Sequence, residues 1–232
     1  MIATFVTQGG PETCEELAPG EVAVYLRRAE RDPAALEHEL TLLDVEEKAR
    51  AARFHFEPDR AMYIASHALR RQVLSRYGAG EAASIRFSKG EHGRPELEGS
   101  SLDLSFSLSN TRELAACAVT RGAILGVDVE QCRQRSYAEL APACLTSDEL
   151  SAWRALPDNE REGRFVLIWT LKEAYAKALG VGLSLPPNSY GVEVQSGGSA
   201  VLAPTLGQTA AGWRLEWQRV EDHCLSTAVR RC

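Results

Sequence analysis

The middle of the chain carries three strand patterns in succession, and this run most constrains the fold. Between residues 102 and 109, leucine or phenylalanine alternates strictly with aspartate or serine, which is typical of a strand with one buried face. The segments LAACAVT (114–120) and AILGVDVE (123–130) follow, separated only by Arg121-Gly122, so we expect them to pair as a hairpin. The run therefore predicts an antiparallel sheet.

Helix signals stand on both sides of this run. Upstream, residues 32–33 and 44–47 are typical helix starts, and a one-sided apolar pattern predicts a longer helix over about 58–77. Downstream, residues 146–149 form a capping box, and residues 165–179 form a second long pattern that Gly180 ends.

Further strand patterns lie near the two ends of the chain, at EVAVYLRR (21–28), GWRLEWQRV (212–220) and CLSTAVR (224–230). Helices followed by strands thus occur twice. We expect an α+β fold of two similar α/β halves related by pseudo-twofold symmetry, each with helices packed on a mainly antiparallel sheet. The expected halves are residues 1–118 and 119–232.

Composition restricts the kind of partner. The 232 residues carry a net charge of -6, which argues against a general nucleic-acid binder. Between Lys48 and Arg76, however, basic residues clearly outnumber the acidic Glu57 and Asp59, which leaves room for an anionic small ligand.

The termini and cysteines indicate a cellular compartment. The first residues resemble no secretory signal, and no window approaches the roughly 18 apolar residues of a membrane span. The 6 cysteines, among them Cys14 and Cys232, include no CxxC pair and are expected to be reduced thiols. We expect a cytoplasmic protein with no membrane partner.

The stretch LGVDVE (125–130) places two acids on one face of a strand. Side chains alternate along a strand, so Asp128 and Glu130 start about 7 Å apart. At that distance two like charges repel by about 2 kcal/mol in an effective dielectric of about 20. The acids are therefore either the solvated side of an edge strand or the ligands of a cation. Oxygen-only ligands favour Mg²⁺ or Mn²⁺, which commonly bind together with substrate phosphates.

A distant helix pattern offers matching groups. Trp169, Glu173 and Lys177 fall four residues apart and share one helix face. Taken alone, this acid and this base indicate no more than an ordinary surface ion pair.

Together the two segments resemble a known family. GVDVE (126–130) and WTLKEAYAK (169–177) are similar to the signatures (I/V)G(I/V)D(I/V)E and W(S/T/C)xKE(A/S)xxK of the 4′-phosphopantetheinyl transferases. The length is similar to that of the monomeric surfactin-synthetase-activating type. Further similar segments, within a resemblance that covers about residues 46–190, are EEKARAARF (46–54), GRP (93–95), FSLSNT (106–111) and GLSLP (182–186).

The resemblance implies a reaction. Such enzymes transfer the phosphopantetheine arm of coenzyme A to a serine of an apo carrier protein of fatty-acid, polyketide or nonribosomal-peptide synthesis, and release adenosine 3′,5′-bisphosphate. By resemblance, Asp128, Glu130 and Glu173 would ligate Mg²⁺, and Glu173 would also be the general base. Lys177 would reach the pyrophosphate.

The resemblance also implies a coenzyme A site where the two halves meet, with its 3′-phosphate and adenine end on the N-terminal half. The implied contacts are Lys48, Arg50, Arg53, Gly93, Arg94, Pro95, Ser109, Asn110, Asp128, Lys172 and Lys177. Of the helix arginines, Arg53, Arg60, Arg70 and Arg71 have solvated or stabilising roles as the alternative.

One departure and two alternatives remain. The family commonly has histidine where this chain has Asn110, an amide that cannot become a cation. We expect the nearby His55, His67 and His92 to be surface or packing residues. A metal-dependent phosphohydrolase would use similar groups with water as the nucleophile, and a binding module would keep the coenzyme pocket without turnover.

Overall fold

The computed structural model divides into two compact units, residues 2–123 and 124–232, which we call the N-terminal and C-terminal units. The division follows Ala123, whereas the sequence predicts it after residue 118. The described residues are 3–6, 16–29, 32–90, 93–99, 102–133, 136–203 and 211–231, so Cys14, His92 and Cys232 lie outside them. No helix within these ranges is both long and apolar enough to cross a membrane.

The N-terminal unit is built on a four-stranded sheet with the order β1-β2-β6-β5. β1 and β2 are parallel, and the other neighbours are antiparallel. β3 and β4 form a separate antiparallel pair. The bounds are β1 (Ala3–Val6), β2 (Val22–Arg28), β3 (Phe87–Lys89), β4 (Pro95–Leu97), β5 (Leu104–Asn110) and β6 (Leu114–Arg121). The strands predicted over 21–28, 102–109 and 114–120 are confirmed as β2, β5 and β6.

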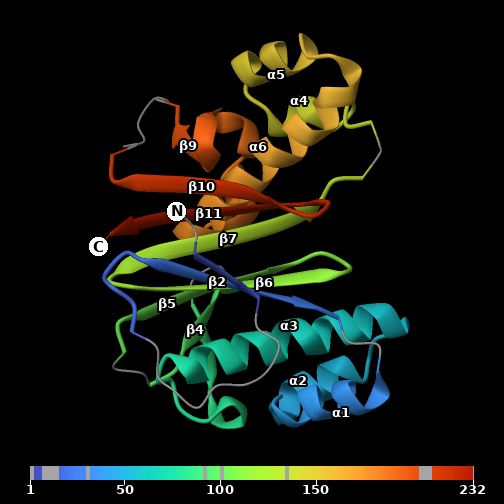
Figure 1. Cartoon of the computed structure of the whole chain (residues 1–232), viewed down its shortest axis with the longest axis vertical. Helices are drawn as coiled ribbons and strands as arrows, with labels where there is room; N and C mark the ends of the chain where they lie inside the picture. The colour runs from blue at the N-terminus through green and yellow to red at the C-terminus, as the bar shows by residue number, and fades with distance from the viewer. Residues whose placement is uncertain are drawn as a thin grey trace. The chain divides into compact units, whose positions relative to one another are not determined.

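The helices of this unit are α1 (Pro33–Thr41), α2 (Val45–Ala51) and α3 (Glu57–Arg76), followed by the short η1 (Ala82–Ser84). The predicted caps are confirmed, because Asp32 accepts a hydrogen bond from the Ala35 amide at 3.0 Å and a capping box opens α2. α3 lies against β2 and β6 (Figure 1). Its apolar stripe and the alternate residues of β6 form the core between helix and sheet.

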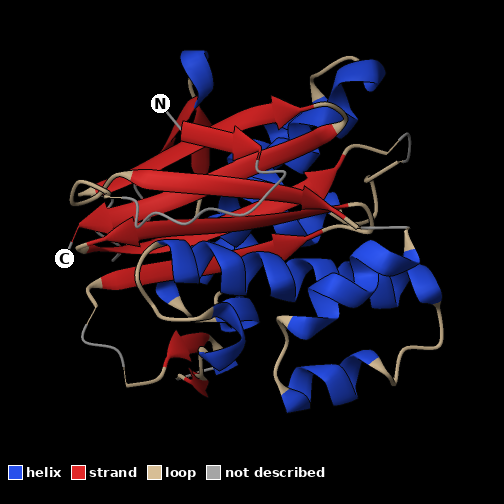
Figure 2. Ribbon diagram, turned by 60° about the horizontal axis from the view of Figure 1, so that its bottom comes forward, coloured by secondary structure: helices blue, strands red, loops and turns tan. Residues whose placement is uncertain are grey.

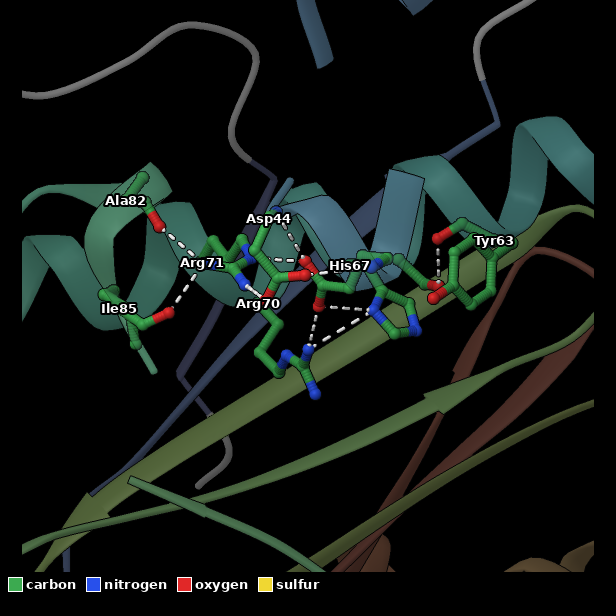
Figure 3. Close-up of polar contacts among 9 residues, drawn as sticks. Asp44, Tyr63, His67, Arg70, Arg71, Ala82 and Ile85 are labelled. Carbon is green, nitrogen blue, oxygen red and sulfur yellow. Dashed lines mark hydrogen bonds and ion pairs between the residues drawn. The ribbon is translucent and has the colours of Figure 1, made fainter. Parts of the chain in front are cut away.

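A buried ion network joins α2 to α3. Glu47 Oε1 accepts from His67 Nδ1 at 2.8 Å and from Arg70 at 2.5 Å, while Glu47 Oε2 accepts from Arg71 Nε at 2.6 Å. Arg71, which is fully buried, also contacts Asp44 and two backbone carbonyls near η1 (Figure 3). Burial alone would raise the pKa of Glu47, but the hydrogen bond from His67, the charge of Arg70 and the hydrogen bond from Arg71 lower that pKa to about 2.

The C-terminal unit is built on a five-stranded sheet with the order β7-β11-β10-β9-β8. Figure 2 distinguishes its strands (red) from the helices (blue). The bounds are β7 (Ala123–Gln131), β8 (Val192–Val194), β9 (Ser199–Leu202), β10 (Trp213–Val220) and β11 (His223–Arg231). The predicted strands β7, β10 and β11 are confirmed, whereas no pattern predicted β8 and β9.

The expected hairpin of residues 114–130 is wrong. β6 pairs with β2 on one edge and with β5 on the other, so its backbone hydrogen bonds are already made inside the N-terminal sheet. β7 instead neighbours β11 in the C-terminal sheet. The turn at Arg121-Gly122 therefore carries the chain from one sheet to another.

The helices of the C-terminal unit are α4 (Ala141–Cys144), α5 (Ser147–Arg154) and α6 (Asp158–Leu179), with the short η3 (Gly182–Ser184), η4 (Pro187–Ser189) and η5 (Ser196–Gly198). The predicted capping box of α5 and the stop at Gly180, which has φ 72°, are confirmed. α6 begins seven residues before the predicted start at Phe165, because its polar first turns, DNEREGR, carry no apolar signal.

β7 approaches α6 so closely that only glycine fits at one position. A Cβ atom on Gly126 would lie 1.9 Å from the carbonyl oxygen of Ala174 and 2.5 Å from the amide nitrogen of Ala178. Because both neighbours are backbone atoms, no side-chain rotation can relieve such a contact. The face of β7 that contains Gly126 is thereby fixed against α6.

We predict that Gly126→Ala destabilises the protein by about 2 kcal/mol or more, since the added methyl forces strand and helix apart. Thermal and urea unfolding measure the change. Gly163→Ala, in α6, is the matched control, because its Cβ would meet only the mobile end of Arg219. Equal stability of the Gly126 and Gly163 variants would contradict the close approach.

We predict that Glu47→Gln destabilises the protein by about 3 kcal/mol near neutral pH, because two buried arginines lose their carboxylate. The folded pKa of Glu47 lies below its ordinary value of 4.5, so its contribution is full above pH 4.5 and is lost as the pH falls towards about 2. Urea unfolding at several pH values should show the two proteins converging in acid. Glu46→Gln, on the exposed side of α2, should match the wild type.

Candidate active site

The strand β7 presents its acids to α6. Leu125, Val127 and Val129 are buried at 1% exposure or less, and the alternate positions carry Gly126, Asp128 and Glu130. The contact of Gly126 with the α6 backbone shows that this second face is the one beside the helix. The predicted division of the strand into an apolar face and an acidic face is thus what the structure has.

Asp128 and Lys177 form an ion pair. Lys177 Nζ lies 2.6 Å from Asp128 Oδ1, and Asp128 is only 3% exposed. Lys177 itself is partly exposed, with its side chain at 31%. The lysine therefore holds the buried aspartate while part of its own side chain remains exposed.

Glu130 contacts the same helix through a different group. Its Oε1 accepts a hydrogen bond from the indole Nε1 of Trp169 at 3.2 Å. The sequence placed Trp169 on the face of Glu173 and Lys177 but assigned it no role. Its spacing of four residues from Glu173 was the only signal of its position.

Glu173 stands among these charges. Burial raises its pKa, the negative charge of Asp128 raises it further, and Glu130 adds to the effect, while Lys177 opposes it. The three acids named as ligands by resemblance therefore interact electrostatically across β7 and α6. Mutual repulsion of this kind is what a bound cation relieves, and carboxylate oxygens suit Mg²⁺.

The structure does not show a metal centre at these acids. Within the described ranges, no three His, Cys, Asp or Glu residues stand close enough together to hold a metal ion. Asp128 is paired with Lys177, and Glu130 accepts a hydrogen bond from Trp169. The metal role of the three acids stays a prediction.

Lys172, a predicted coenzyme contact, lies in a buried network. Its Nζ donates to Glu149 Oε2 at 2.5 Å and to the carbonyl oxygens of Pro187 at 2.7 Å and Cys144 at 3.0 Å. Burial lowers its pKa, and Glu149 opposes that shift. An ammonium group has three donors, and all three are used here, so this placement favours a structural role.

The N-terminal unit contains a basic pocket of about 1040 Å³. Four of the predicted coenzyme contacts line it: Arg50, Arg53, Gly93 and Pro95. So do Lys89, Tyr63, His67 and Arg70, which the sequence did not assign to the site. His67 and Tyr63 are four residues apart on α3 and their rings lie 4.0 Å apart, whereas Lys89 comes from the β3–β4 pair, which no pattern predicted.

The remaining predicted contacts of this unit lie around the pocket rather than in its lining. Lys48 is exposed on α2. Arg94 donates to the carbonyl oxygen of Phe106 at 3.2 Å, and burial lowers its pKa. On β5, Ser109 is buried, while Asn110 is exposed and donates to the backbone oxygen of Thr111 at 3.1 Å.

Two family models match the chain, one in each of the two units. The model of the 4′-phosphopantetheinyl transferase superfamily matches residues 124–228, and that of the N-terminal domain of 4′-phosphopantetheinyl transferase matches residues 30–121. These matches cover both units separately.

Named relatives span most of the chain. The 4′-phosphopantetheinyl transferase HetI of Nostoc sp. is 30% identical over 219 residues, which are 92% of this chain and 89% of that protein. The 4′-phosphopantetheinyl transferase Sfp of Bacillus subtilis is 29% identical over 159 residues, which are 68% of this chain and 70% of that protein. The chain therefore belongs to the 4′-phosphopantetheinyl transferase superfamily.

Proposed function

We propose that the protein transfers 4′-phosphopantetheine from coenzyme A to a serine of an apo acyl or peptidyl carrier protein, in a Mg²⁺-dependent reaction that releases adenosine 3′,5′-bisphosphate. Family membership supports carrier-protein phosphopantetheinylation. The observation that carries the finer proposal is the meeting of Asp128, Glu130, Glu173 and Lys177 across β7 and α6.

In the proposed reaction, the serine oxygen attacks the phosphorus that carries the pantetheine arm. The bond from that phosphorus to the bridging oxygen breaks, and the leaving bisphosphate takes the bonding electrons. Glu173 accepts the serine proton, directly or through a water molecule.

Lys177 would bind a pyrophosphate oxygen. Its Nζ donates to Asp128 Oδ1 at 2.6 Å, which places the positive charge beside the acids of the site. Asp128, Glu130 and Glu173 would hold Mg²⁺ or Mn²⁺. A bound cation of this kind would offset the charge that develops as the bridging bond breaks.

The 3′-phosphate and adenine end of coenzyme A would bind the pocket of the N-terminal unit. Arg50 and Arg53 are exposed there beside the aromatic rings of Phe54 and Tyr63, and the Arg50 guanidinium lies 5.6 Å from the Tyr63 ring centre. Arginine suits phosphate because its planar group can donate two parallel hydrogen bonds. That the active site lies where the two halves meet stays a prediction.

Glu173→Gln should lower transfer at least about 100-fold, because it removes a proton acceptor and a charge while it keeps the side-chain shape. The assay incubates protein, coenzyme A, Mg²⁺ and an apo carrier protein, and weighs the carrier by mass spectrometry. Glu160→Gln, exposed in the first turn of α6, is the control and should transfer normally. Hydrolysis of coenzyme A without any gain of carrier mass would instead favour a phosphohydrolase.

Arg50→Ala should raise the KM for coenzyme A by about 10-fold or more, with little change for dephospho-coenzyme A, which lacks the 3′-phosphate. Steady-state kinetics with both donors measures the difference. Arg60→Ala is the control, because Arg60 is paired with Glu57 at 2.9 Å and does not line the pocket. An equal rise of KM for both donors would show that Arg50 does not bind the 3′-phosphate.

A further inference from the structure

Trp169 contacts the acidic strand through a single polar atom. Its indole Nε1 donates to Glu130 Oε1 at 3.2 Å, which links the middle of α6 to β7. The ring is partly buried and packs against the core of the C-terminal unit. The core therefore fixes the ring, and the ring in turn directs the carboxylate.

Strand and helix run in opposite directions past each other, so their residues meet in a fixed order. Gly126 meets Ala174 and Ala178, and Asp128 meets Lys177. Glu130, further along the strand, meets Trp169, which lies two helical turns before Lys177. Glu173 lies halfway between the tryptophan and the lysine on the same helix face.

The two strand acids receive chemically different contacts from α6. Lys177 brings Asp128 a positive charge. The indole N–H of Trp169 is a neutral donor that can accept nothing, so it orients Glu130 without cancelling the charge of its carboxylate. This is the contact expected for a carboxylate that must be oriented and yet keep its affinity for a cation.

We propose that Trp169 is a positioning residue, whose indole N–H keeps the carboxylate of Glu130 on the side of β7 beside α6, where it would bind a divalent cation. The inference rests on the proposed function, because it takes Glu130 as a ligand of Mg²⁺ or Mn²⁺. It gives a role to a residue that the sequence left without one.

The test separates metal affinity from turnover. Trp169→Phe keeps an aromatic ring but removes the donor, so the Mg²⁺ concentration for half-maximal transfer should rise about 10-fold or more, with kcat at saturating Mg²⁺ within about twofold of wild type. Mn²⁺ binding in the presence of coenzyme A, followed by electron paramagnetic resonance without any carrier, should weaken by the same factor.

Trp153→Phe is the matched control. Trp153 also donates its Nε1 hydrogen, but to the backbone oxygen of Arg161 at 2.7 Å, where no acid of the site is involved. This variant should keep the metal dependence of the wild type. A Trp169→Phe protein that binds Mn²⁺ and responds to Mg²⁺ as the wild type does would overturn the inference and leave the proposed transfer standing.

A measurement on the unaltered ring covers the case in which Trp169→Phe does not fold. In protein with ¹⁵N-labelled indoles, the Trp169 Nε1–H resonance should shift on addition of Mg²⁺ and should shift in Glu130→Gln, while the Trp153 resonance moves in neither. A Trp169 resonance that ignores both changes would refute the inference. Full transfer by wild type in excess chelator would refute both the metal site and this inference, but not the transfer itself.

Discussion

The contact between the backbones of β7 and α6 is the constraint on which the candidate site depends. With a hydrogen atom in place of a side chain at Gly126, the strand lies directly on the helix at Ala174 and Ala178. This backbone contact also fixes which later residues of β7 lie beside which residues of α6. Asp128 lies beside Lys177, and Glu130 lies beside Trp169. A strand held even one side chain further out would lose both contacts, since hydrogen bonds weaken steeply beyond their normal length.

Neighbouring residues of α6 do different work because a helix turns about 100° per residue. Lys172 points into the unit, where it ties α6 to Glu149 and to the backbone at the end of α4 and at η4. Glu149 also caps α5 and accepts from the Val192 amide at 2.8 Å. Glu173, one residue later, stands with the acids of β7. Of the adjacent residues Lys172 and Glu173, the lysine thus anchors the helix and the glutamate belongs to the candidate site.

Local patterns predicted most of the elements, and side-chain pairing was what they could not predict. The caps at Asp32, Asp44 and Thr146 depend on residues only three apart, so they are visible in the sequence. The hairpin failed because the pairing of β6 depends on β2, which lies about ninety residues earlier. The burial of Lys172 depended in the same way on Glu149 and Pro187, whose positions only the folded chain defines. The acidic face of β7 was predictable, but its indole partner was not.

Glu47 in the N-terminal unit and Glu173 in the C-terminal unit have opposite electrostatic surroundings. In the N-terminal unit, Glu47 has two arginines and a histidine around it, and its pKa falls to about 2. In the C-terminal unit, partial burial raises the pKa of Glu173, and the two neighbouring acids raise it further while one lysine opposes them. A group whose charge is fully matched inside the chain stabilises the fold. A group surrounded by like charges is instead destabilised as an anion, and perturbed groups of this kind are candidates for a functional site.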